Sequence, residues 1–172
     1  MSFDTAGDEL FEPLRKNRIF ISIFGIASTV GDFSIVWHVT GLLYAIGSMH
    51  RLHQAIALSI ALGAESIIVN QGVKRIFRRE RPTVSGDDRF DVRTPSTSSF
   101  PSGHASSATF AAIILMWMTG FPLAILWIIM AGIVALSRVV VRIHHLSDIV
   151  GGLITGAILG ATAVPIISSM IG

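Results

Sequence analysis

Apolar segments long enough to form membrane helices make up most of this chain, and they restrict its possible folds more than any other feature. Five of them, residues 33–48, 53–74, 104–119, 121–141 and 145–171, are joined by short polar links and one longer loop. A helix of about 20 apolar residues crosses the hydrocarbon core of a bilayer. We therefore predict an all-α fold, a polytopic membrane helical bundle of five to six transmembrane helices.

The number of transmembrane helices depends on a sixth apolar segment, residues 18–30, which would form a helix only about 20 Å long. It could lie at the interface, tilt, or insert partway into the ~30 Å hydrocarbon core. The polar residues 1–17 before it carry four acidic side chains ahead of the first basic ones. Because they lack the basic start and cleavage site of a signal peptide, we interpret them as an interfacial helix.

Composition supports a single membrane-embedded domain over residues 1–172, and we expect a multi-pass protein of the plasma membrane. Only 14% of the residues are charged, whereas a soluble domain carries about 25%. The chain contains no cysteine, which excludes disulfides, thiol catalysis and zinc–thiolate sites. Its basic residues cluster at the ends of apolar segments rather than over an open face, so a nucleic-acid partner is not expected.

The one long polar stretch, residues 75–103, is predicted to be the active-site loop. Two spans separate it from the short link 138–144. An even number of crossings returns the chain to the same membrane face, so the unusual polar residues of both segments should gather there.

Basic side chains fill residues 74–82, directly after the third span. Long basic side chains at helix ends often form a snorkelling collar at the level of the headgroups. That interpretation accounts for Arg75, Arg78 and Arg79. For Lys74 and Arg81, a collar and an anion-binding role remain equally open.

Ser102, Gly103 and His104 stand where the segment 104–119 begins. Ser102 can cap the helix, Gly103 allows close approach to the backbone, and the first N–H groups of a helix bind anions. A histidine in the first turn is placed to protonate a group bound there. The alternative is an ordinary serine cap beside an unrelated histidine.

Arg138, His144 and Asp148 form a third cluster. The four-residue spacing places His144 and Asp148 on one helix face, where the carboxylate can accept a proton from one ring nitrogen and leave the other as a nucleophile. Ionisable pairs at a membrane helix end are expensive and indicate function. His145 points about 100° away from that face and is interpreted as structural.

Together the clusters supply an oriented histidine, a second histidine at a helix N-terminus and several cations. Phosphoryl transfer needs a nucleophile, an acid for the leaving oxygen and positive charge around the phosphoryl oxygens. Guanidinium and ammonium groups can supply that charge without a metal. The clusters therefore favour a phosphate ester as substrate.

Three motifs resemble the three-part signature of the type 2 phosphatidic acid phosphatase superfamily. In order, they are Lys74-x6-Arg81-Pro82, Pro101-Ser102-Gly103-His104 and Ser137-Arg138-x5-His144-x3-Asp148. The resemblance implies the membrane-embedded helical core of that family, related to acid phosphatases, in a lipid phosphate phosphatase without a metal or other cofactor. The chain is shorter than the larger members of the family.

The resemblance also implies roles in a phosphohistidine mechanism. His144 would attack phosphorus, Asp148 would orient it, and His104 would protonate the leaving alkoxide and then activate water. The phosphoryl oxygens would be held by Lys74, Arg81, Ser102, Gly103 and Arg138. The substrate would be a lipid phosphate monoester or a polyprenyl phosphate or diphosphate, and the residues do not select a headgroup.

Two further classes remain as alternatives. A metal-dependent hydrolase could use His104, His144 and Asp148 as ligands, and a transporter could use intramembrane charge as an ion path. Within the span 53–74, Glu65 is expected to be paired inside the bundle and Asn70 to lie near the site.

The membrane face and the oligomeric state are also open. Five spans would place most basic residues on the active-site face and hence that face in the cytoplasm, although many bacterial members of the family face outward. In the last segment, Gly152, Gly156 and Gly160 let another helix approach closely. We expect that partner to be within the chain, with a homodimer through this helix as the alternative.

Overall fold

The computed structural model describes residues 2–82 and 96–171, and the regular secondary structure within them is all helical. Its helices are α1 (Phe3–Phe11), α2 (Arg18–Val30), α3 (Ile35–Ala45), α4 (Met49–Ile67), α5 (Lys74–Ile76), α6 (Gly103–Thr119), α7 (Leu123–Val140) and α8 (Leu146–Ile171). A π-helical stretch, Ile68–Val73, continues α4 into α5. Short 3-10 turns, Leu14–Lys16 and Asp32–Ser34, precede α2 and α3.

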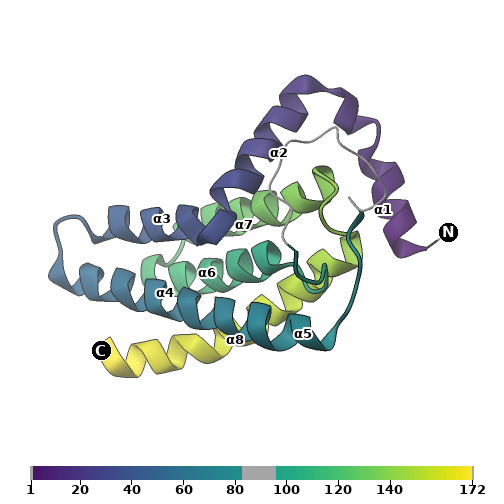
Figure 1. The fold of residues 1–172 in the computed structure, drawn as a ribbon. Helices are drawn as coiled ribbons and strands as arrows, with labels where there is room; N and C mark the ends of the chain where they lie inside the picture. Colours follow the sequence, from purple (N-terminus) through teal and green to yellow (C-terminus); the bar gives the residue numbers. More distant parts are fainter. Residues whose placement is uncertain (1, 83–95, 172) are drawn as a thin grey trace.

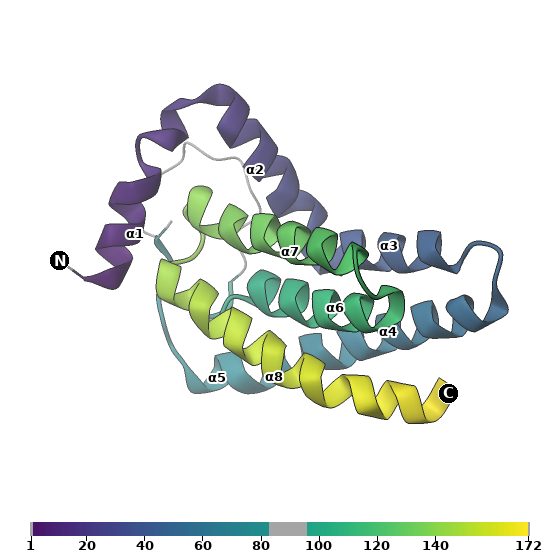
Figure 2. The same ribbon diagram turned by 180° about the vertical axis from the view of Figure 1, so that it is seen from behind.

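Helix α6 is the centre of the bundle. Helices α3, α4, α7 and α8 lie around it, whereas α1 and α2 project at an angle from one end (Figures 1 and 2). The side chains that α6 buries are mostly small or aliphatic, among them Ala108, Ala111, Ile114 and Leu115. The buried side chains of α6 therefore form much of the apolar core against which the neighbouring helices pack.

Apolar helices of spanning length confirm a membrane protein. Within residues 2–82 and 96–171, three are long and apolar enough to cross a bilayer: Met49–Ile76, Leu123–Val140 and Leu146–Ile171. Helices α2 and α3 provide a fourth span if they are one crossing bent by 65°. The bend falls where Phe33 and Ser34 have φ of 53° and 59°, a conformation that a continuous helix does not contain.

The glycines of α8 pack against α6 within the chain. A Cβ at Gly156 would lie 2.2 Å from the carbonyl oxygen of Ser106, and one at Gly152 would lie 2.5 Å from that of Ser102. At Gly160 the nearest atoms, at 3.2 Å, belong to Ile113. The intramolecular interpretation is therefore confirmed, and α6 covers the face that a homodimer through this stripe would need.

The two predicted polar segments meet at one end of the bundle, as expected. The amide of Ser102 donates to the carbonyl of Asp148 at 2.9 Å, and the Arg81 guanidinium donates to the carbonyl of Ile143 at 3.2 Å. Residues 83–95 of the predicted active-site loop lie outside the described part of the chain.

Candidate active site

His144 lies in the link between α7 and α8, with only 3% of its surface exposed. Its amide donates to the carbonyl of Arg138 at 3.1 Å, which ties the link to the end of α7. The ring Nε2 lies 3.1 Å from Nη1 of Arg81, and Nδ1 lies 3.4 Å from Oδ2 of Asp148. A guanidinium only donates, so Nε2 is the acceptor and Nδ1 carries the proton toward Asp148.

Asp148 stands in the first turn of α8 and is fully buried. Its Oδ2 accepts from the amide of His145 at 2.8 Å, and its Oδ1 accepts from Nη1 of Arg79 at 2.7 Å. These two bonds hold the carboxylate beside the His144 ring. The 3.4 Å separation of Asp148 from Nδ1 is long for a hydrogen bond, as is common for catalytic pairs without substrate.

Three buried cations surround this pair, namely Lys74, Arg81 and Arg138. Arg81 also donates to the carbonyls of Thr97 and Ser98, at 3.1 and 3.2 Å, which fixes its fork. Burial lowers the pKa of Arg81 to about 10, against the opposing effect of Asp148, so it stays charged at neutral pH. Among the described residues, Nε and Nη2 of Arg138 have no hydrogen-bond partner, so both can donate to an anion.

Burial and this positive surround keep the His144 ring neutral. The pKa of His144 is lowered to about 3, chiefly by burial; the contact with Asp148 opposes this shift, and the charges of Arg81, Arg138 and Lys74 add to it. At neutral pH the ring therefore keeps the lone pair on Nε2 that a nucleophile needs.

Replacing Arg81 with glutamine is expected to raise the pKa of His144, because one of the three cations that lower it is gone. The acid limb of kcat/KM should then move to higher pH than in wild type, together with a fall in kcat/KM. Profiles from about pH 2.5 to 8, which include the acid limb of the wild type, would measure both effects. Arg51→Gln, at the opposite end of the bundle, should leave the limb in place, and an unmoved limb in Arg81→Gln would contradict this account.

His104 occupies the first turn of α6, which Ser102 caps by accepting from the amide of Ala105 at 3.4 Å. Its Nε2 lies 3.1 Å from Oδ1 of Asp32 and 3.2 Å from the carbonyl oxygen of Ser28. Both partners are acceptors, so Nε2 carries a proton and Nδ1 is the nitrogen that can exchange one with substrate. Ser28 also accepts from Arg138 through its hydroxyl, which places His104 beside that cation.

The backbone approaches closely between the first and second motifs. A Cβ at Gly103 would lie 3.5 Å from Nζ of Lys74 and 3.4 Å from Oδ1 of Asn70. The absence of a side chain at Gly103 thus leaves the Lys74 ammonium next to the start of α6. Asn70 lies near the site, as the sequence predicted.

Glu65 is paired inside the bundle, again as predicted, because its carboxylate accepts a hydrogen bond from the Ser106 hydroxyl of α6. His145 serves the link through its backbone, in line with the structural role expected of it. Arg75 is exposed and donates to Gln71, as a basic collar would.

Sequence reasoning missed two side chains at the site. The collar interpretation is wrong for Arg79, whose guanidinium is two-thirds buried and bonds Asp148. Asp32, the partner of His104, was not identified, although a lone carboxylate between the apolar segments 18–30 and 33–48 was a usable signal. Arg79 carried no signal that separated it from its basic neighbours.

The geometry does not gather the metal ligands that the alternative hydrolase would need. Across residues 2–82 and 96–171, no group of three or more histidine, aspartate or glutamate side chains converges on one point. His104 faces Asp32 whereas His144 faces Asp148. The three residues named for that alternative therefore belong to two separate pairs.

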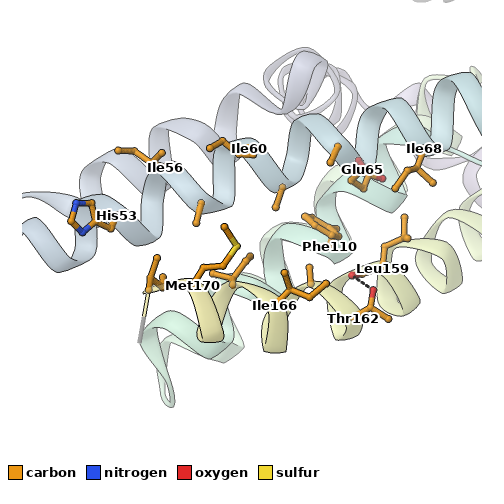
Figure 3. Close-up of a pocket in the computed structure, with 16 residues that line it drawn as sticks. His53, Ile56, Ile60, Glu65, Ile68, Phe110, Leu159, Thr162, Ile166 and Met170 are labelled. Carbon is orange, nitrogen blue, oxygen red and sulfur yellow. Dashed lines mark hydrogen bonds between the residues drawn. The ribbon is translucent and has the colours of Figure 1, made fainter.

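An apolar groove of about 810 Å³ runs between α4 and α8 (Figure 3). His53 lies at one end, and Glu65 and Ile68 lie at the other, toward the site. Its walls are mainly aliphatic, including Ile56, Ile60, Leu159, Ile166 and Met170, with Phe110 of α6 between them. The groove has the volume and the apolar lining to hold part of a hydrocarbon chain.

A second cavity, of about 690 Å³, adjoins the site and is basic. Residues 96–98 form part of its wall, and its cationic side chains are Lys74, Arg75, Arg78, Arg79 and Arg81. An anionic headgroup larger than one phosphate would meet positive charge there.

A sequence profile of the PAP2 superfamily matches residues 53–169. The chain is 37% identical over 135 residues to decaprenylphosphoryl-5-phosphoribose phosphatase of Mycobacterium tuberculosis, covering 78% of this chain and 73% of the relative. It is 26% identical over 165 residues to undecaprenyl-diphosphatase of Sulfolobus acidocaldarius, covering 94% and 78%.

Solved structures share the fold. Aquifex aeolicus LpxE superposes with a TM-score of 0.72 at 21% identity, covering 91% of this chain and 93% of that one. A PAP2-type phosphatidylglycerolphosphate phosphatase from Bacillus subtilis superposes with a TM-score of 0.70 at 19% identity, covering 97% and 85%.

Proposed function

The chain belongs to the PAP2 superfamily of membrane lipid phosphatases, and we propose that it transfers the phosphoryl group of a polyprenyl-linked phosphate through a phosphohistidine on His144. One observation carries the mechanism. The His144 ring is held as the neutral tautomer with Nε2 as acceptor, between Asp148 and three buried cations. That arrangement fits a nucleophile whose target is a phosphate.

In the first step, the lone pair of His144 Nε2 forms a bond to phosphorus, and the bond from phosphorus to the leaving oxygen breaks. Arg81 donates to Nε2 at 3.1 Å before the reaction, and it turns its Nη1 onto a phosphoryl oxygen as phosphorus takes its place. Lys74 and Arg138 stabilise the other phosphoryl oxygens, with the Ser102 hydroxyl and the Gly103 amide. Asp148 stabilises the positive charge that develops on the ring.

His104 moves the protons in both steps. It starts as an imidazolium and donates its Nδ1 proton to the leaving alkoxide; the neutral ring then takes a proton at Nδ1 from the water that attacks phosphorus, which restores the imidazolium. The P–N bond then breaks, and phosphate leaves with His144 neutral again. Asp32 acts here as a positioning residue, because its bond to Nε2 turns Nδ1 toward the substrate and stabilises the imidazolium.

For the substrate, we propose a polyprenyl chain that carries a sugar phosphate, with a polyprenyl diphosphate as the second candidate. The α4–α8 groove supports a long hydrocarbon chain, since it is apolar and ends near Glu65 toward the site. The basic cavity supports a headgroup with a second phosphate. The 37% identity to the mycobacterial phosphoribose phosphatase supports the first candidate over the diphosphate.

For the topology, we propose five crossings in the plasma membrane: the bent α2–α3 pair, Met49–Ile76, α6, α7 and α8. Helix α6 has 17 residues, about 26 Å at 1.5 Å per residue, and lies among the longer spans. Five crossings put the 75–82 arginines on the same side as Arg15, which bonds the carbonyls at the end of α7. Arg51 lies at the other end, so the positive-inside rule favours a cytoplasmic active site.

The test is phosphate release by the purified protein in detergent with EDTA. The panel would hold decaprenylphosphoryl-5-phosphoribose, undecaprenyl diphosphate, phosphatidylglycerol phosphate and phosphatidate. We expect the first to give the highest kcat/KM, by at least about tenfold, and EDTA to leave activity unchanged. A higher kcat/KM for undecaprenyl diphosphate would select the second candidate, and loss of activity in EDTA that Mg²⁺ or Zn²⁺ restores would overturn the mechanism.

A further inference from the structure

Helix α1 docks against the start of α8, next to the catalytic pair. Asp4, in its first turn, directs its carboxylate at Ser147, the residue before Asp148. Oδ1 accepts from the Ser147 amide at 2.8 Å, and Oδ2 accepts from the Ser147 hydroxyl at 3.0 Å. A side chain from another helix thus caps the N-terminus of α8, where a negative charge is favoured.

Arg79 joins this carboxylate to that of Asp148. Its Nη2 donates to Oδ2 of Asp4 at 2.5 Å, while Nη1 donates to Oδ1 of Asp148 at 2.7 Å and to the Ser147 hydroxyl at 2.6 Å. The planar fork therefore lies between two carboxylates. Removal of one carboxylate would let the guanidinium rotate, and its bond to the other would change.

The charge on Asp4 is maintained by the same contacts. Burial alone would raise the pKa of Asp4, but the bonds from Ser147 and Arg79 outweigh it and lower the pKa below its ordinary value. Asp4 is therefore ionised at neutral pH and attracts the guanidinium that also bonds Asp148.

The position of Asp4 is fixed by the docking of α1 at further points. Gly7 lies against Leu146, where a Cβ would come within 2.9 Å of that side chain. The buried Arg15 donates to Asp8 at 3.0 Å and to the carbonyl of Val139 at 2.8 Å. Helix α1 thus has contacts of its own with α7 and α8 that do not pass through Asp4.

We infer that Asp4 is a positioning residue for the phosphatase reaction. It holds Asp148 against His144 through the Arg79 guanidinium, which donates to both carboxylates. The inference rests on the phosphohistidine mechanism proposed above, and it extends the catalytic constellation to a helix that none of the three motifs includes. Asp4 touches neither substrate nor His144, so its effect should fall on kcat rather than on KM.

The test compares Asp4→Asn with two other neutralised acids of α1 in full-length protein. Asp8→Asn weakens the docking of α1 through Arg15 and Arg142 but leaves the Asp4–Arg79–Asp148 contacts. Glu9→Gln changes an exposed side chain. With undecaprenyl diphosphate or phosphatidate as the probe, we expect Asp4→Asn to lower kcat about tenfold, with KM within about twofold of wild type. Both other variants should stay within about threefold.

Two further measurements separate positioning from a loss of folding. Asp4→Glu should recover part of the lost kcat, since it keeps the charge, and the thermal midpoint of each variant in detergent should be recorded. In a double-mutant cycle, adding Asp4→Asn to Arg79→Gln should lower kcat by less than about twofold more, because both act on one contact.

Equal losses in Asp4→Asn and Asp8→Asn, or full additivity with Arg79→Gln, would overturn the inference and leave only a role in docking. An Asp4→Asn variant that resembles Glu9→Gln would also overturn it. None of these three results would affect the proposed mechanism. That mechanism fails on a different outcome, namely activity retained in His144→Ala.

Discussion

Replacing His144 with alanine is expected to lower kcat by about 10⁴-fold or more. The variant loses Nε2 of His144, the acceptor nitrogen beside Arg81 and among three buried cations, so the nucleophile that would form the covalent intermediate is gone. The cations still bind the phosphate, and KM should therefore change much less than kcat. Phosphate release from the preferred lipid, measured over a range of lipid concentrations up to saturation, gives both constants.

The intermediate offers a second readout for the same variant. Wild-type protein quenched at alkaline pH during turnover should carry one labile phosphate on the peptide that contains His144, and the variant should carry none. His50→Ala, at the far end of the bundle, serves as a control for histidine loss and should keep wild-type activity. Normal turnover by His144→Ala would contradict the mechanism, and turnover that then depends on an added metal would favour the metal-dependent alternative.

The catalytic pair could be predicted from the sequence because its geometry is local. His144 and Asp148 are four residues apart, and that spacing alone predicts an imidazole beside a carboxylate. The predicted shared helix face is wrong in detail, because His144 lies in the link two residues before α8 begins, whereas Asp148 stands in the first turn of α8. The convergence of the three motifs was also predictable, since it follows from the number of spans between them.

The supporting residues could not be predicted in the same way, because their partners are distant in the chain. Arg79 lies among similar arginines, and only the packing of α8 shows that it, rather than Arg75, bonds Asp148. Asp4 reaches Ser147 across almost the whole chain. Asp32 becomes a partner of His104 only because the chain bends by 65° between α2 and α3.

The fold class followed from apolar length, whereas the number of spans did not. The sequence predicts five to six crossings, whereas helix length and composition in the described part of the chain support three, or four with the bent pair. The difference arises at short helices. Helix α2 is as apolar as a membrane helix, but its 13 residues are too few to cross the bilayer on their own.

Substituting alanine for Gly156 is expected to destabilise the bundle and to lower activity with it. A Cβ there would lie 2.2 Å from the carbonyl oxygen of Ser106, and that oxygen belongs to backbone inside α6, which cannot turn aside as a side chain could. Alanine adds about 1 kcal/mol of helix propensity, but overpacking of this kind costs about 1–3 kcal/mol or more. The steric term prevails, and the thermal midpoint in detergent should fall by several degrees.

Gly63→Ala is the matched control for this substitution. Gly63 is an exposed glycine in α4, and a Cβ there would meet no atom within 4 Å, so its thermal midpoint should be unchanged or slightly higher. The same shift that separates α8 from α6 would move Ser102 and His104 away from Asp148, so Gly156→Ala should also lose kcat at temperatures where it remains folded. Equal stability and kcat in the two variants would contradict the close contact between Gly156 and the α6 backbone.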